Sequence, residues 1–166
     1  MAQLKDSSLL KQEKGVLKKN AFIVLVKTEW NAFITDELEN GCRRILEQSG
    51  VKKIETLTVP GSFEIPFAVK NYFRKAAKKS KPDAFIALGC VIRGDTPHFD
   101  YVCKGVTDGI LQLNLLLPVP VIFGVLTVDN EQQARERIGG SHGHKGEEAA
   151  ITALKMINSA FVKKRK

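Results

Sequence analysis

Short apolar-rich segments alternate along the chain with longer segments in which apolar positions recur every three or four residues. The short segments predict strands, which we place at 21–26, 54–59, 84–88 and 121–126. The first of them is continuously apolar, which is typical of a strand covered on both faces of its sheet. Helical spacing predicts helices between the strands and a last helix over 147–161.

Capping signals place the ends of two of these helices. Thr35 is a suitable N-cap for the first helix, and Gly50 fits its C-terminal end. The Asp-Asn pair that ends at Asn130 predicts the start of a helix through Arg137. The glycine-rich segment 139–146 predicts a loop before the last helix.

The resulting order of elements is β-α-β-α-β-α-β-α-α, with no internal repeat. Such alternation predicts an α/β fold, in which a mostly parallel four-stranded sheet lies between two layers of helices. A chain of 166 residues is most simply one domain. We divide it into a polar N-terminal arm at 1–20, a domain at 21–162 and a basic tail at 163–166.

Charge and composition narrow the class of protein. Of the formal net charge of +8, residues 1–20 carry +3 and residues 163–166 carry +4, which leaves +1 for the domain. This distribution argues against a basic nucleic-acid groove in the fold, although the two ends can still contact polyanions. No apolar stretch reaches the length of a membrane span and no signal-peptide pattern is present, so we expect a cytoplasmic protein without membrane or nucleic-acid partners.

Metal and nucleotide sites find little support in the sequence. Three cysteines without C-x-x-C spacing indicate reduced thiols. His142 and His144 suggest a metal site, but no third ligand matches them, and a solvated glycine-rich loop explains them better. The chain also has neither of the glycine-rich motifs that bind nucleotide phosphates. We therefore predict no bound metal.

The segment from residue 84 to 101 carries the strongest candidate chemistry. A buried strand leads into Gly94, Asp95 and Thr96, and a helix follows from about His98. Ligands of open α/β sheets bind beyond the carboxyl ends of strands, and a helix N-terminus offers free N–H groups to an anion. The imidazole of His98 can transfer a proton near neutral pH, or it can simply cap the helix.

Three further features can contribute to a site, each with a plainer alternative. Trp30 follows the first strand and can stack on a flat heterocycle, or it can be an aromatic at the rim of the core. Residues 62–64 can hydrogen-bond a polar ring, or they can form a capping turn. Arg137 can bind a phosphate with two parallel hydrogen bonds, although a surface ion pair is its commoner role.

Five segments together resemble the 6,7-dimethyl-8-ribityllumazine synthase family, and they occur in the order found in that family. They are Val59–Pro66, Leu88–Asp100, Phe123–Thr127, Gln133–Arg137 and Lys145–Ala150. The resemblance extends from about Ala21 to Ile157. His144 departs from it, because the family usually has Asn before the Lys-Gly pair.

The resemblance implies a flavodoxin-like fold and a transferase of riboflavin biosynthesis. The reaction condenses 5-amino-6-(D-ribitylamino)uracil with 3,4-dihydroxy-2-butanone 4-phosphate, and it gives 6,7-dimethyl-8-ribityllumazine, phosphate and water. No metal or organic cofactor is implied. The implied assembly is a homopentamer or an icosahedral shell of pentamers, with riboflavin synthase as a candidate partner.

The resemblance also assigns roles to residues. His98 is implied in proton transfer. The residues implied in binding the pyrimidine are Trp30, Ser62, Phe63, Glu64, Cys90, Val91, Ile92 and Phe123, the last from a neighbouring subunit. Those implied in binding the phosphate substrate are Gly94, Asp95, Thr96, Arg137 and Lys145. A rival hypothesis is a non-catalytic flavin- or lumazine-binding shell protein, which would keep the stacking residues and lose the phosphate and proton-transfer groups.

Overall fold

A single four-stranded sheet forms the centre of the computed structural model, which describes residues 21–160. Its strands are β1 (Phe22–Thr28), β2 (Lys53–Val59), β3 (Ala84–Ile92) and β4 (Val121–Val128). They lie in the order β2-β1-β3-β4, and all three pairings are parallel. The predicted sheet is therefore confirmed, and it is parallel throughout. The predicted arm and the predicted basic tail lie outside the described residues.

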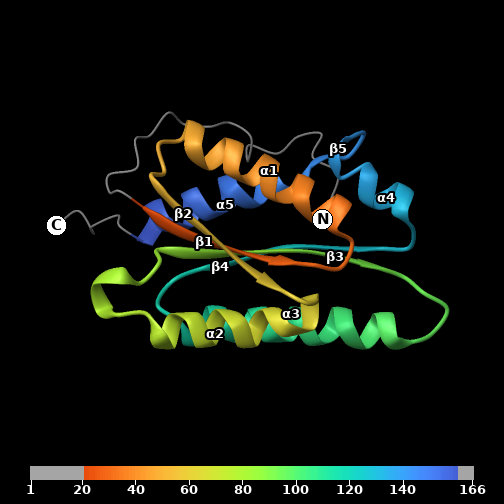
Figure 1. The fold of residues 1–166 in the computed structure, drawn as a ribbon, viewed down its shortest axis with the longest axis horizontal. Helices are drawn as coiled ribbons and strands as arrows, with labels where there is room; N and C mark the ends of the chain where they lie inside the picture. The colour runs from red at the N-terminus through yellow and green to blue at the C-terminus, as the bar shows by residue number, and fades with distance from the viewer. Residues whose placement is uncertain (1–20, 161–166) are drawn as a thin grey trace.

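Helices cover both faces of the sheet (Figure 1). On one face lie α1 (Ala32–Gln48) and α5 (Lys145–Ala160), and on the other lie α2 (Ile65–Lys75) and α3 (His98–Leu116). The shorter elements are η2 (Ser62–Glu64), η3 (Lys78–Ser80), α4 (Glu131–Arg135), β5 (Ile138–Gly140) and β6 (Gly143–His144). This arrangement is the flavodoxin-like three-layer α/β/α sandwich that was predicted.

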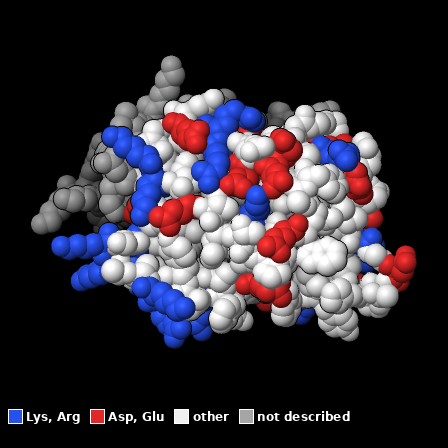
Figure 2. Space-filling model, in the orientation of Figure 1, with Lys and Arg blue, Asp and Glu red and all other residues white. Residues whose placement is uncertain are grey.

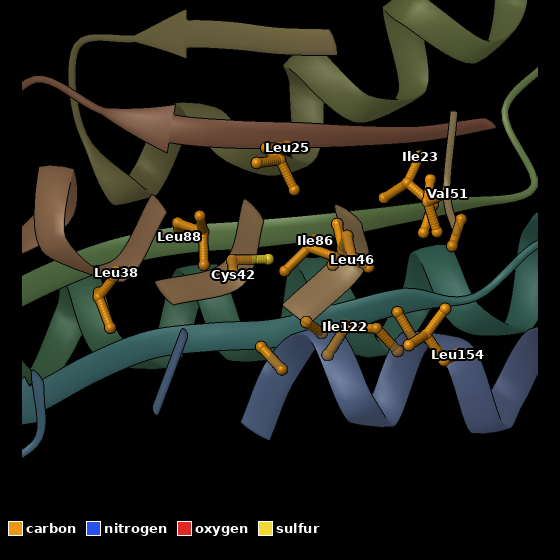
Figure 3. Packing of buried hydrophobic residues seen from close by; sticks show 14 of the residues in the cluster. Ile23, Leu25, Leu38, Cys42, Leu46, Val51, Ile86, Leu88, Ile122 and Leu154 are labelled. Carbon is orange, nitrogen blue, oxygen red and sulfur yellow. The ribbon is translucent and has the colours of Figure 1, made fainter. Parts of the chain in front are cut away.

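The first strand shows why its sequence is apolar without interruption. Ile23 and Leu25 belong to the core cluster under α1 and α5, whereas Val24 and Val26 belong to the cluster under α2 and α3. Successive side chains of a strand point to opposite faces, so a strand covered on both faces needs apolar residues at every position. Figure 3 shows the first cluster, with Cys42 of α1 among its buried residues.

The first helix begins three residues before the predicted N-cap. Asn31 adopts the left-handed conformation, with φ 58° and ψ 45°, and turns the chain directly from β1 into α1. Thr35 is instead buried within the helix, and its hydroxyl donates a hydrogen bond of 2.9 Å to the carbonyl of Thr28. The prediction of Thr35 as N-cap is wrong, because its hydroxyl ties the helix to the strand and does not cap it.

The predicted loop at 139–146 is also wrong. The antiparallel hairpin of β5 and β6 occupies much of it, and α5 begins at Lys145, two residues earlier than predicted. These strands are too short to produce an alternating pattern. The N-cap at Asn130 is confirmed, since its side chain accepts a hydrogen bond from the backbone N–H of Gln133. Helix α4 nevertheless ends at Arg135, and not at Arg137.

Basic side chains gather at one end of the molecule (Figure 2). At this end α2 finishes and η3 follows, and the two carry Arg74, Lys75, Lys78 and Lys79. The carboxyl ends of the strands lie at the opposite end (Figure 1). The basic surface of the fold is thus remote from the edge where a ligand is expected. None of the helices within residues 21–160 has the length and apolar character that a membrane span needs.

His144 joins the hairpin to two helices. It is the residue before α5, and its Nδ1 atom accepts a hydrogen bond of 3.4 Å from the backbone N–H of Glu147. Its ring packs so closely on Gly41 that a Cβ atom there would lie 2.1 Å from Cε1. Burial lowers the pKa of His144 from its ordinary value of 6.5, and the Arg44 guanidinium lowers it further, against the opposing carboxylates of Glu147 and Glu37.

We predict that His144 makes the fold less stable in mild acid. Because its pKa is lower in the folded chain, the unfolded chain takes up the proton at a higher pH. The contribution to the free energy of unfolding is complete above about pH 6.5 and is lost as the pH falls below that value. His144→Asn keeps a capping side chain without a titrating ring. Its melting temperature should fall less than that of the wild type between about pH 7.5 and about pH 5.5. Equal pH dependence of the two proteins would contradict this role.

Candidate functional site

A cavity of about 540 Å³ opens at the carboxyl ends of β1 and β3. Eight residues predicted for the site line it, namely Trp30, Ser62, Phe63, Glu64, Cys90, Val91, Ile92 and His98. Four residues that were not predicted line it as well, namely Asn31, Gly61, Tyr101 and Val102. The fold thus brings together segments that lie up to about seventy residues apart in the sequence.

The third strand is longer than predicted, and this extension forms one wall of the cavity. It continues from the predicted end at Leu88 to Ile92, because residues 89–92 pair with β4 up to Val128. The backbone of Cys90, Val91 and Ile92 is therefore fixed by the sheet. Burial raises the pKa of the Cys90 thiol to about 12, so the thiol stays protonated at neutral pH and is a poor nucleophile.

Asn31 fastens the exits of two strands to each other. Its Nδ2 atom donates a hydrogen bond of 2.9 Å to the carbonyl of Cys90. The neighbouring backbone N–H of Trp30 donates to the carbonyl of Pro60, at 3.2 Å, and so holds the exit of β2 in the same way. A left-handed backbone at a non-glycine residue is strained, and Asn is among the residues that tolerate it best. The sequence places Asn31 directly after the aromatic at the strand exit, but no role was predicted for it.

The η2 turn is held in place by two close approaches to glycine. A Cβ atom on Gly89 of β3 would lie 2.7 Å from the hydroxyl of Ser62, and one on Gly105 of α3 would lie 2.5 Å from the ring of Phe63. A Cβ atom at Gly89 would force Ser62 to shift, and one at Gly105 would displace the ring of Phe63. Ser62 is consequently buried, whereas the side chains of Phe63 and Trp30 are 60% and 74% exposed. The turn is fixed, and the aromatic rings beside it are open to a ligand.

His98 is the first residue of α3, and its side chain is exposed at the cavity. Its backbone N–H donates to the hydroxyl of Thr96, at 3.4 Å. Tyr101 and Val102 follow at three and four residues, so they lie on the same face of the helix and join the cavity wall. This helical spacing was the available signal for both of these unpredicted residues. The exposed residues 94–96 precede the helix, next to the cavity but outside its lining.

The other predicted phosphate-binding residues lie elsewhere in the chain. The Arg137 guanidinium donates a hydrogen bond of 2.8 Å to the carbonyl of Gln133. Lys145 is buried at the start of α5, where its ammonium group pairs with Glu148 at 2.6 Å. Neither residue lines the cavity. Within one chain, the predicted site residues therefore fall into two separate groups.

Phe123 also lies apart from the cavity. It is opposite Ala87 in the register of β3 and β4, and its half-buried ring packs on the core cluster under α2 and α3. In the described sheet, β4 is an edge strand. The structure does not bring Phe123 to the pyrimidine-binding residues of its own chain.

The described residues contain no group of three or more His, Cys, Asp or Glu side chains arranged to hold a metal ion. His142 contacts Glu136, with 3.3 Å between Nδ1 and Oε2, and His144 takes part in the cap of α5. The two histidines thus have different partners.

The chain is similar in sequence to named proteins over most of its length. A family model described as 6,7-dimethyl-8-ribityllumazine synthase matches residues 20–160. A protein of that name from Parabacteroides distasonis is 53% identical over 138 residues, which cover 82% of this chain and 84% of the relative. One from Bacteroides fragilis is 49% identical over 136 residues, covering 81% and 92%. The match spans both groups of site residues and the fold that carries them, so the chain belongs to the 6,7-dimethyl-8-ribityllumazine synthase family.

Proposed function

We propose that the protein is the transferase that makes 6,7-dimethyl-8-ribityllumazine in riboflavin biosynthesis. An amino group of 5-amino-6-(D-ribitylamino)uracil attacks the ketone of 3,4-dihydroxy-2-butanone 4-phosphate. Water leaves and an imine forms. Loss of a proton and of the phosphate then gives an intermediate that closes to the second ring with loss of another water. The family and the relatives support this activity.

The cavity at the strand exits is the observation that carries the proposal. Its volume of about 540 Å³ lies within the range of small-molecule sites. The exposed ring of Trp30 offers a stacking surface for a flat pyrimidine. The backbone of Cys90–Ile92 offers fixed hydrogen-bonding groups, while Ser62, Phe63 and Glu64 provide the opposite wall. We infer that the pyrimidine and its ribityl chain bind here.

We assign proton transfer to His98. It is the histidine of the cavity wall, and it stands where the helix begins. Gly94, Asp95 and Thr96, which are separated from it by Pro97, lie where free backbone N–H groups favour an anion. A phosphate bound there would place the carbon chain of the second substrate between His98 and the pyrimidine. Orientation of the two substrates and proton transfer are then the main work of the protein.

The separation of the two groups of residues supports a site shared between subunits. We propose that Phe123 and Arg137 of one subunit complete the cavity of its neighbour, with Lys145 lying next to Arg137. The edge position of β4 favours this arrangement, and so do the apolar side chains that α3 leaves exposed. These are Leu111, Leu115 and Leu116 at 59%, 79% and 72%. Monomers rarely expose such a patch without a partner.

A homopentamer is the assembly we propose, with a shell of pentamers as its possible extension. The association with riboflavin synthase and the cytoplasmic location stay predictions from the family resemblance. The rival function, a binding protein without catalysis, would retain the cavity and lack proton-transfer and phosphate groups. The presence of His98 and Arg137 in the chain favours the enzyme.

The assay that tests this function mixes the two substrates with the purified protein. We expect the fluorescent lumazine to form faster than it does without protein, together with one phosphate for each lumazine. A rate equal to the uncatalysed background, with tight binding of the pyrimidine, would favour the rival function.

Replacing His98 should separate catalysis from binding. We expect His98→Ala to lower kcat by about 100-fold, the size of a general acid–base contribution, with little change in the dissociation constant of the pyrimidine. His142→Ala is the matched control, because that histidine lies outside the cavity. Weaker pyrimidine binding with an unchanged kcat would remove His98 from proton transfer.

Mixed assemblies can test whether the site is shared. We expect His98→Ala and Arg137→Ala to be nearly inactive alone. Co-assembled in equal amounts, the two should regain activity, because about a quarter of the interfaces then pair an intact His98 with an intact Arg137. If both residues acted within one chain, no mixture would contain a complete site. Mixtures as inactive as their components would therefore contradict the shared site.

A further inference from the structure

Arg93 connects three elements around the loop that precedes His98. It directly follows β3, and its backbone N–H donates a hydrogen bond of 2.9 Å to the carbonyl of Val128. Its Nε atom lies 3.0 Å from Oδ1 of Asp129, beyond the end of β4. Its Nη2 atom lies 3.3 Å from Oδ1 of Asp100, in the first turn of α3. One guanidinium thus joins the exits of two strands to the start of a helix.

The same side chain also packs on an aromatic ring. The Cζ atom of Arg93 lies 4.1 Å from the centroid of Phe99, the second residue of α3. A planar guanidinium can stack on a ring and keep its donors directed at carboxylates, which an ammonium group cannot do. These contacts therefore depend on the planar shape of the Arg93 guanidinium as well as on its charge.

These contacts cannot contribute much to global stability. The side chains of Arg93, Asp100 and Asp129 are 43%, 62% and 65% exposed. Ion pairs in such positions are screened by water and typically stabilise a fold by about 0–1 kcal/mol. Their effect is on orientation, because they act on both ends of a four-residue loop. That loop, 94–97, carries the N–H groups assigned to the phosphate, and His98 follows it.

We propose that Arg93 is a positioning residue, which holds the phosphate-binding loop and the start of α3 in register with the sheet edge by its contacts with Asp129, Asp100 and Phe99. This inference rests on the proposed function. Arg93 does not line the cavity, so it acts through the loop and through His98. It differs from Arg137, which is assigned to the phosphate itself.

The test is the steady-state kinetics of Arg93→Gln, Arg93→Lys and Asp129→Asn. We expect Arg93→Gln to raise KM for the phosphate substrate about tenfold and to lower kcat, since small misplacements of reacting groups are costly. The dissociation constant of the pyrimidine and the melting temperature should stay near the wild-type values. Arg93→Lys should show a smaller rise in KM and a smaller fall in kcat than Arg93→Gln, without reaching the wild-type values. Arg74→Gln, the same change on an exposed residue of α2, is the control.

Asp129→Asn separates positioning from direct contact. If Arg93 positions the loop, removing its partner should also raise KM for the phosphate substrate. The double variant should then be little worse than Arg93→Gln, because the two residues act through one contact. If Arg93 bound the phosphate directly, removing Asp129 would free the guanidinium, and KM would fall or stay the same.

Three results would overturn the proposal. The first is unchanged kinetics in Arg93→Gln, and the second is a lower or unchanged KM for the phosphate substrate in Asp129→Asn. The third is an equal loss of affinity for both substrates in Arg93→Gln, together with a lower melting temperature. The last result would indicate a merely structural residue. Wild-type protein that forms no lumazine would contradict the proposed function, and this outcome is distinguishable because it precedes any comparison of variants.

Discussion

The parallel pairing of β1 with β3 is the constraint on which the rest of the structure depends. The chain crosses from β1 to β2 on one side and later returns to place β3 on the other side of β1. Helix α1 leaves toward one face of the sheet and α3 toward the other (Figure 1). A crevice must open where adjacent strands send their helices to opposite faces. The cavity lies at this point, and the hydrogen bond from Asn31 to the carbonyl of Cys90 joins two of the residues that line it.

A single chain brings only part of the predicted site residues to its cavity. The sheet edge gathers aromatic and backbone groups, which suit a flat and polar ring. The buried pair of Lys145 and Glu148 and the guanidinium of Arg137 lie outside the cavity. If these groups complete the cavity of a neighbouring subunit, as we propose, assembly has a physical reason, because each copy then supplies what its neighbour lacks. The exposed leucines of α3 suit the same interpretation.

Periodicity was sufficient to predict the sheet and its two helical layers, because burial on both faces leaves a strong signal in strands such as β1. Most of the cavity wall could also be predicted, since strand exits in a parallel sheet share one edge. The predicted ends of helices and strands are wrong where tertiary contacts decide them. Thr35 resembles a cap but bonds to Thr28, and β3 runs on to Ile92 because β4 offers it a partner. No role was predicted for Asn31, because hydrophobic spacing does not reveal a left-handed backbone or the hydrogen bond to Cys90.

The most direct measurement of the central claim uses the one tryptophan of the chain, Trp30. Titration with 5-amino-6-(D-ribitylamino)uracil should quench its emission saturably, with the same dissociation constant as calorimetry gives, because the ring would stack on the exposed indole at the cavity mouth. Calorimetric binding that leaves the tryptophan emission unchanged would contradict the claim that the sheet edge between β1 and β3 holds the pyrimidine.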